Sequence, residues 1–288
     1  MSCQEERRTV TRSSQASFKT MPGRTDTHFH VFGPEARYPY RTELTYAPPA
    51  ATPAAYMALA ERLGIDRAVI VQASVYGSDN SRQLDAMREI AGVETRAVVV
   101  VDPDVSDEEL DELHHKGARG VRFIATRPGS LPLAQLERIA SRIRRWGWHV
   151  ALMLDGRSIV ALEDRLQKLP CPFVIDHLAD PDAQKGTEQP AFQALLRLLR
   201  SGNCWTKISA PYHMNTAAPA YDELEPLVEA LLAEAPDRLL WATDWPHAAT
   251  HGPTPDATDL LSALYSWCDE TVLTKIMVRN PAALYGFG

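Results

Sequence analysis

Near its N-terminus the chain reads Thr25-Asp26-Thr27-His28-Phe29-His30-Val31-Phe32. Successive side chains of a β-strand point to opposite faces, so His28 and His30 would share one face of a strand here. Two imidazoles near the C-terminal end of a strand form a candidate metal or acid–base site, although a pair of polar residues beside a loop also fits. The site is favoured because two later stretches carry matching chemistry, Ile175-Asp176-His177 and Thr243-Asp244-Trp245-Pro246-His247.

Eight short apolar runs alternate with longer amphipathic segments. We expect strands at Arg24–Phe32, Arg67–Ala73, Arg96–Asp102, Gly120–Ala125, His149–Leu154, Phe173–Leu178, Trp205–Ser209 and Leu239–Asp244. Several of these runs are continuously apolar, as expected for parallel strands buried on both faces. The repeated strand–helix alternation predicts right-handed crossovers and a closed (β/α)8 TIM barrel.

Helices are expected between the strands. Their predicted ranges are Pro53–Leu63, Asn80–Ala91, Asp107–His115, Leu133–Trp146, Arg157–Leu169, Gln189–Leu199, Tyr221–Ala235 and Pro255–Trp267, with a terminal helix over Glu270–Tyr285 that breaks near Asn280-Pro281. We predict one barrel domain over residues 21–288 after a flexible polar tail over residues 1–20. A Pro- and Tyr-rich insertion near residues 33–52 is too long for an ordinary βα loop. Both a lid over the site and a plain surface excursion fit this insertion.

The composition of the chain argues against several classes of function. With 288 residues, 45% of them hydrophobic, the chain is long enough for a large core. The net charge of −7 and the absence of a basic stripe argue against a nucleic-acid partner. No apolar run approaches the roughly 20 residues that a membrane helix needs. Four widely spaced cysteines without a C-x-x-C pair indicate neither a zinc knuckle nor a disulfide framework, so a reducing cytoplasm is the default location.

Ionisable residues gather at the predicted strand ends, where the active sites of such barrels lie. We expect His28, His30, His177 and Asp244 to converge there as the catalytic group. Arg122 sits inside an apolar strand, where an unpaired charge is costly. It fits either an ion pair with a neighbouring Asp or a clamp on a substrate carboxylate or sulfonate.

Further residues are candidate substrate contacts. Arg127 lies in a Pro/Gly loop, where a solvated arginine is also common. Ser74 and Tyr76 follow the second strand, in a stretch whose Asp79 and Asn80 suit turn and N-cap roles. The remaining candidates, which follow the seventh and eighth strands, are Tyr212, His213 and His247.

Together these motifs resemble the amidohydrolase superfamily, and more narrowly its branch of 2-pyrone-4,6-dicarboxylate and sulfomuconolactone hydrolases. The resemblance runs from about Arg24 to Tyr285. It implies that a small anionic lactone is opened by water that Asp244 activates, while the three histidines polarise the carbonyl. It leaves open whether no metal is needed or one divalent ion, zinc above all, is held by His28, His30 and Asp244.

The chain also departs from the superfamily pattern. Arg122 occupies the strand where many members carry a Lys or Glu that bridges two metals, and Leu152-Met153-Leu154 occupies the place of a ligand histidine. Both departures argue against a two-metal site. The dicarboxylate lactonase carries a further arginine where this chain has Tyr212-His213-Met214, so the identity of the lactone stays open. Two other functions remain possible on the same residues: a single-zinc decarboxylase or C–C hydrolase, and a non-catalytic small-molecule binding barrel.

Overall fold

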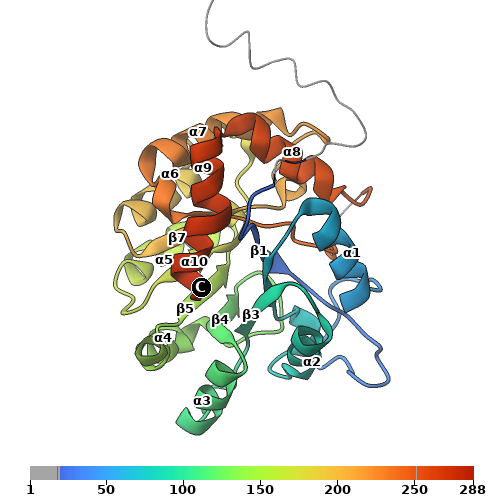
Figure 1. The fold of residues 1–288 in the computed structure, drawn as a ribbon. Coiled ribbons are helices and arrows are strands. Elements are labelled where there is room, and N and C mark those ends of the chain that lie inside the picture. The colour runs from blue at the N-terminus through green and yellow to red at the C-terminus, as the bar shows by residue number, and fades with distance from the viewer. Residues whose placement is uncertain (1–17, 19, 251) are drawn as a thin grey trace, which may run out of the picture.

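The structure is a computed structural model that describes residues 18, 20–250 and 252–288. The predicted tail over residues 1–20 therefore lies almost wholly outside the described residues. Eight parallel strands pair in chain order, and helices surround them (Figure 1). The strands are β1 (Thr25–Phe29), β2 (Arg67–Val71), β3 (Glu94–Val99), β4 (Ala118–Ile124), β5 (His149–Met153), β6 (Phe173–Ile175), β7 (Cys204–Ile208) and β8 (Leu239–Trp241).

Contacts between β1 and the end of β8 close the sheet. Thr27 Oγ1 donates to the Trp241 carbonyl at 2.8 Å, and His30 N donates to the Trp245 carbonyl at 2.8 Å. The predicted (β/α)8 barrel is confirmed. All eight strands end one to three residues earlier than expected, and after two of them the backbone turns out of the sheet where the site begins. After β6 it takes left-handed φ values from His177 to Asp180, and after β8 it does so at Asp244.

Ten α-helices are described. They are α1 (Pro53–Leu63), α2 (Ser81–Glu89), α3 (Asp107–His115), α4 (Leu136–Ile143), α5 (Gly156–Leu166), α6 (Pro190–Arg200), α7 (Glu225–Glu234), α8 (Ala257–Trp267), α9 (Glu270–Thr274) and α10 (Asn280–Tyr285). Local sequence fixes several N-termini, since Thr52 and Ser106 accept hydrogen bonds from the first turns of α1 and α3. The expected break in the terminal helix is a π-helical turn over Lys275–Arg279. None of the described helices is both long and apolar enough to span a membrane.

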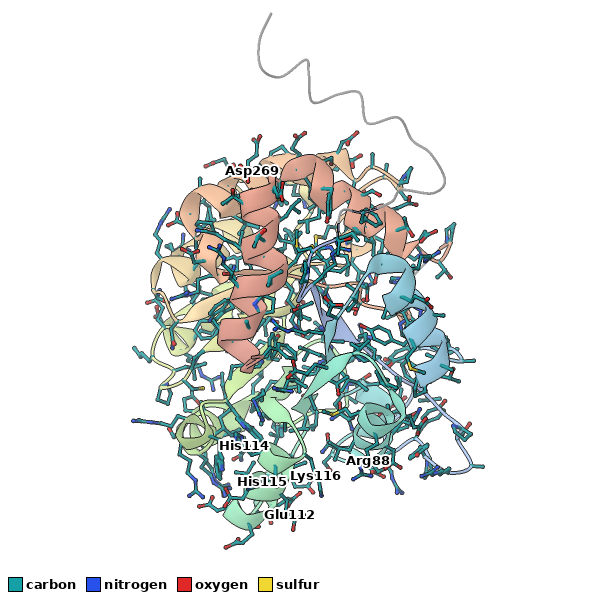
Figure 2. The ribbon with its side chains drawn as sticks, in the orientation of Figure 1. Arg88, Glu112, His114, His115, Lys116 and Asp269 are labelled. Carbon is teal, nitrogen blue, oxygen red and sulfur yellow. The ribbon has the colours of Figure 1, made fainter. Side chains whose placement is uncertain are left out.

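The end of the barrel opposite the strand C-termini is filled by the end of the chain. Tyr285 and Phe287 pack with interior strand residues such as Val69 and Val98. His149 opens β5 at this end, with its ring against that of Tyr285 at 5.1 Å. His114 and His115 end α3 on the outside of the molecule (Figure 2), where His115 is exposed. These positions place three of the nine histidines of the chain away from the strand C-termini.

Candidate active site

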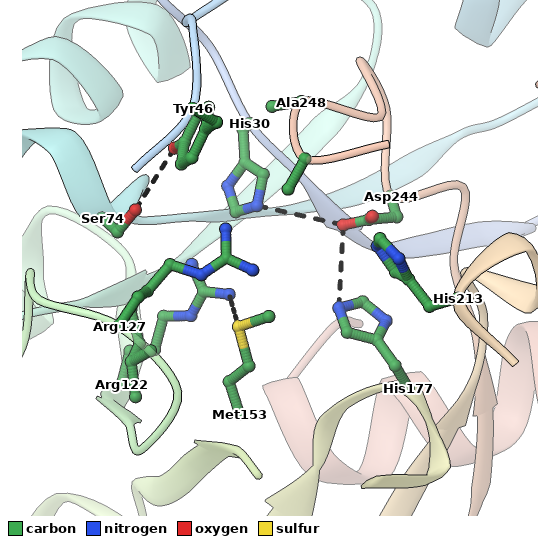
Figure 3. A pocket seen from close by; sticks show the side chains of 12 residues that line it. His30, Tyr46, Ser74, Arg122, Arg127, Met153, His177, His213, Asp244 and Ala248 are labelled. Carbon is green, nitrogen blue, oxygen red and sulfur yellow. Dashed lines mark hydrogen bonds and ion pairs between the residues drawn. The ribbon is translucent and has the colours of Figure 1, made fainter. Parts of the chain in front are cut away.

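A cavity with about 410 Å³ of empty volume opens among the C-terminal ends of the strands (Figure 3). It is lined by His30, Tyr46, Ser74, Arg122, Ile124, Arg127, Met153, His177, His213, Asp244, Ala248 and Ala249. Seven of the predicted site residues are among these, and they come from loops and strands across the whole barrel. The barrel therefore collects at one place the chemistry that is dispersed along the sequence.

Three imidazoles converge on one carboxylate oxygen. Oδ1 of Asp244 lies 3.5 Å from His28 Nε2, 3.9 Å from His30 Nε2 and 3.8 Å from His177 Nε2. The Nε2 atoms of His28 and His30 are 3.2 Å apart. His28 stands just beneath the cavity and is fully buried. The convergence expected from the sequence is present.

Asp26 holds the two strand ends that carry this cluster together. Its carboxylate accepts hydrogen bonds from the backbone N of Thr243 at 3.0 Å and from Thr243 Oγ1 at 2.6 Å. Asp244 N in turn donates to the His28 carbonyl at 2.9 Å. The left-handed φ of 56° at Asp244 then turns its side chain toward the histidines. The strand-one motif thus positions both the imidazoles and the carboxylate opposite them.

Burial sets the protonation of the cluster. It lowers the pKa of His30 and that of His177 to about 3, and it lowers the pKa of His28 well below its usual value. Burial raises the pKa of Asp244 to about 7, although a hydrogen bond from Tyr212 opposes this shift. Near neutral pH the imidazoles are therefore uncharged, while the carboxyl group can both take and release a proton.

Tyr212 and His247 stand behind Asp244. The Tyr212 hydroxyl donates to Asp244 Oδ2 at 2.6 Å and lies 3.2 Å from His247 Nδ1. Neither residue lines the cavity, although both were expected to contact substrate. Tyr212 holds one carboxylate oxygen, with His247 on the far side of its hydroxyl, and Oδ1 is left to face the imidazoles.

Two guanidinium groups face the cavity. Arg122 donates to the Gln72 carbonyl at 2.7 Å, and its nearest carboxylate, Asp176, is 3.9 Å away. Arg122 therefore has the predicted ion pair, at a long distance, and also faces the cavity, while its role as an anion clamp stays a prediction. Arg127 lines the cavity with its guanidinium 5.6 Å from the centre of the Tyr46 ring. The cavity thus presents two positive charges on the side away from Asp244, as Figure 3 shows.

The insertion near residues 33–52 reaches the cavity through Tyr46, whose hydroxyl lies 3.2 Å from Ser74 Oγ. Ser74 lines the cavity as expected. Tyr76 lies elsewhere: its ring packs in an aromatic cluster with Phe32, and its hydroxyl accepts a hydrogen bond from Gly33 N at 2.9 Å. Tyr76 therefore holds the start of the insertion in place and does not line the cavity.

Two buried charged residues beneath the cluster, Lys207 and Asp176, had no predicted role. Lys207 of β7 places Nζ 2.8 Å from Asp176 Oδ1 and 3.1 Å from His28 Nδ1. The sequence did contain an indication of a role for Lys207, because this residue interrupts an apolar strand as Arg122 does. Asp176 was visible only as the residue before His177. Its burial alone would raise its pKa, but Lys207 and His28 reverse the effect and hold the pKa well below the usual value.

The spacing of the cluster suits one divalent ion. Around tetrahedral zinc, with bonds of about 2.0–2.2 Å, neighbouring ligand atoms lie about 3.3–3.5 Å apart. The facing atoms of His28, His30 and Asp244 are separated by 3.2, 3.5 and 3.9 Å. All three residues are buried, and nitrogen and carboxylate ligands are those that zinc accepts. In residue type and spacing, these three side chains match the zinc ligand set that was expected from the sequence.

Comparison with known proteins gives consistent matches. Residues 25–287 match the family described as amidohydrolase. A 2-pyrone-4,6-dicarboxylate hydrolase of Comamonas testosteroni is 36% identical over 284 residues, which cover 94% of this chain and 93% of that protein. A 4-sulfomuconolactone hydrolase of Hydrogenophaga intermedia is 37% identical over 276 residues, which cover 93% of this chain and 90% of that protein.

Solved structures share the fold of this chain. A crystal structure from Agrobacterium tumefaciens superposes with a TM-score of 0.84 at 30% identity, covering 93% of this chain and 97% of that one. A crystal structure from Acinetobacter baumannii, which holds citric acid, gives a TM-score of 0.81 at 26% identity and covers 92% of this chain and all of that one.

Proposed function

The chain belongs to the amidohydrolase family, and we propose that it is a hydrolase that opens the ring of a small anionic lactone. The observation that carries the proposal is the arrangement of one cavity. A carboxylate poised to exchange a proton faces three uncharged imidazoles, and two guanidinium groups stand opposite. Two relatives at 36% and 37% identity are named as hydrolases of anionic lactones.

Asp244 is the base in the proposed reaction. Its Oδ1 takes a proton from a water molecule while the water oxygen forms a bond to the lactone carbonyl carbon. The tetrahedral intermediate then collapses, the bond between that carbon and the ring oxygen breaks, and the ring oxygen takes the proton from Asp244. One water molecule is added and a hydroxy acid results. A base with a pKa of about 7 suits proton transfer near neutral pH.

The other residues bind and orient. The imidazole cluster faces the position of the carbonyl oxygen, where preorganised hydrogen-bond donors stabilise the developing negative charge. Arg122 and Arg127 pair with a carboxylate or sulfonate on the ring, for which guanidinium groups are well shaped. Ser74 and Tyr46 close the side of the cavity that faces the insertion.

A divalent ion would give an alternative to this scheme. His28, His30 and Asp244 are the residues that would hold it, and His177 would then orient the substrate. When bound, such an ion polarises a carbonyl group and lowers the pKa of a coordinated water. The same ligand spacing favours one alternative function, a zinc-dependent decarboxylase or C–C hydrolase.

The test is hydrolysis of a small panel by protein purified without added metal. The panel holds 2-pyrone-4,6-dicarboxylate, 4-sulfomuconolactone and an uncharged lactone of similar size, each assayed before and after chelation. Metal content is measured on the same sample by elemental analysis. We expect at least one anionic lactone to be opened, with the uncharged lactone at least about 10-fold slower because it lacks charged hydrogen bonds. If no lactone is opened, and a chelator-sensitive decarboxylation is found, the alternative function holds.

A further inference from the structure

The ammonium group of Lys207 lies inside the barrel, against the ring of His28. Its Nζ is 3.1 Å from His28 Nδ1 and 2.8 Å from Asp176 Oδ1, and all three side chains are fully buried. An ammonium group carries only donors. His28 Nδ1 must therefore accept a hydrogen bond, which means that this nitrogen is bare. A doubly protonated ring would direct an N–H group at the ammonium.

The contacts of His30 also indicate that the proton of His28 is on Nε2. Its Nδ1 lies 2.7 Å from the Val71 carbonyl oxygen, which can only accept, so the proton of the neutral His30 ring is on Nδ1. The bare Nε2 of His30 lies 3.2 Å from Nε2 of His28. Only His28 can donate in that contact. The hydrogen bonds therefore run in one direction, from Lys207 through His28 and His30 to the Val71 carbonyl.

We propose that Lys207 is a positioning residue that fixes the proton of His28 on Nε2. His28 then donates to His30 within the cluster, and its Nε2 lacks the lone pair that a metal needs. Neither the tautomer nor its effect on metal affinity depends on the proposed lactone hydrolysis.

Without Lys207, His28 could donate its Nδ1–H to Asp176 and bind a metal through Nε2. A histidine that binds zinc through one nitrogen usually donates its other N–H to a carboxylate or a carbonyl. His30 already meets this condition through Val71. His28 would meet it through Asp176, whose Oδ1 is 3.5 Å from His28 Nδ1 and 2.8 Å from Lys207 Nζ. The Lys207 ammonium competes for both His28 Nδ1 and Asp176 Oδ1. His28 Nε2 therefore keeps its proton and cannot serve as a metal ligand.

The experiment uses full-length protein labelled with ¹⁵N in its histidines. Two-dimensional NMR of the metal-free enzyme reports which ring nitrogen of each histidine is protonated, and the His28→Gln variant assigns the signals. We expect His28 to carry its proton on Nε2 in the wild type and on Nδ1 in Lys207→Met. Zinc affinity, measured by competition with a chromophoric chelator, is expected to be about 10–100-fold tighter in Lys207→Met, which is the usual size of effects from residues that orient metal ligands.

Two variants control for charge and for folding. Lys185→Met removes an exposed lysine paired with Asp182 and is expected to change neither the tautomer nor the zinc affinity. Asp176→Asn keeps Lys207, and zinc affinity is expected to stay weak. The proposal is overturned if wild-type His28 has a bare Nε2, or if zinc binds wild type and Lys207→Met equally. Should Lys207→Met fail to fold, the wild-type tautomer alone decides. None of these readouts requires a known lactone, so they stand even if the proposed hydrolysis fails.

Discussion

At the scale of single residues, the site depends on burial acting oppositely on two kinds of side chain. The same desolvation that keeps His30 and His177 uncharged raises the pKa of Asp244 to about 7. The hydrogen bond from Tyr212 limits that rise and holds Oδ2, so Oδ1 is the oxygen available for proton transfer. A base of adjustable charge beside neutral imidazoles follows from placing these residues inside the barrel.

The pH dependence of activity follows from this carboxyl group. In the proposed reaction Asp244 acts only when deprotonated, so kcat/KM on the lactone should rise as pH increases through about 7 and then level off. Asp180 provides the control, because burial and the neighbouring Asp244 also raise its pKa to about 7. In Asp180→Asn the rise should persist and move to lower pH, since a nearby negative charge is gone. A pH profile that becomes flat in Asp180→Asn would assign the rise to Asp180 instead.

Arg127 tests recognition of the anionic group. Arg127→Gln removes a charged hydrogen bond of about 1.5–3 kcal/mol, so KM for an anionic lactone should increase about 10–100-fold with little change in kcat. Steady-state kinetics on anionic and uncharged lactones separate the effects. The KM for the uncharged lactone should not change. The matched control is Arg62→Gln, which changes an exposed arginine of α1 that pairs with Asp256. Equal losses on both lactones would remove Arg127 from anion recognition.

The residue types of the site were predictable from the sequence, but their orientations were not. His28, His30, His177 and Asp244 were found from strand periodicity and from the position of strand ends. Tyr212 and His247 were placed near the right strand ends, yet both lie behind the carboxylate. Left-handed backbone at Ala210 precedes Tyr212, and left-handed backbone at Asp244 and His247 turns the segment after β8. Such turns leave no signal in the sequence, because non-glycine residues rarely adopt them.

At the scale of elements, the loops after β2 and β4 touch at the rim of the cavity. A Cβ atom added to Gly129, which has a φ of 115°, would lie 2.2 Å from the Ser74 carbonyl oxygen. The loop after β2 carries Ser74, and the loop after β4 carries Arg127. Close approach of these two backbones therefore sets the distance between a hydroxyl and a guanidinium that line the same cavity.

Gly129→Ala should disturb that contact. Gly202→Ala is the matched control, because Gly202 also has a positive φ, of 77°, but no atom within 4 Å of an added Cβ. Both variants should lose about 1–2 kcal/mol of the free energy of unfolding from the left-handed backbone. Gly129→Ala should lose about 1–3 kcal/mol more from overpacking and should raise KM for the lactone. Urea denaturation and kinetics measure both effects, and equal behaviour of the two variants would contradict the packing argument.

Element boundaries show where sequence patterns stop being informative. The apolar runs located all eight strands, and the predicted starts of α1 at Pro53 and of α3 at Asp107 are confirmed. The runs overestimated the C-terminal ends of β1, β3, β6 and β8 by three residues each. In β1, β6 and β8, polar site residues continue the alternating pattern after the backbone has left the sheet. Tyr46 was missed as a lining residue because only the barrel brings the insertion back over the cavity.

At the scale of the whole molecule, the barrel has two ends with different tasks. The strand C-termini carry the cavity, while Tyr285 and Phe287 fill the opposite end. The Tyr285 hydroxyl is buried and has no hydrogen-bond partner among the described residues. Its ring, by contrast, packs against interior strand residues and His149.

This arrangement predicts opposite outcomes for two substitutions. Tyr285→Phe removes an unpaired buried hydroxyl and should leave the free energy of unfolding unchanged or slightly higher. Tyr285→Ala should lower it by about 3–5 kcal/mol, because a large aromatic ring leaves a cavity. Urea denaturation of both variants provides the comparison. A Tyr285→Phe variant as unstable as Tyr285→Ala would mean that the hydroxyl, and not the ring, stabilises this end of the barrel.

In the proposed reaction, the barrel links fold to chemistry by assembling Asp244 as the base that opens an anionic lactone. The most direct test is kcat/KM of Asp244→Asn against the wild type, on the anionic lactone that the wild type turns over. Asparagine preserves the shape and still accepts the hydrogen bond from Tyr212, so folding should be retained. Loss of a positioned base predicts a decrease of about 10²–10⁴-fold in kcat/KM. An Asp244→Asn enzyme with wild-type kcat/KM would contradict the account.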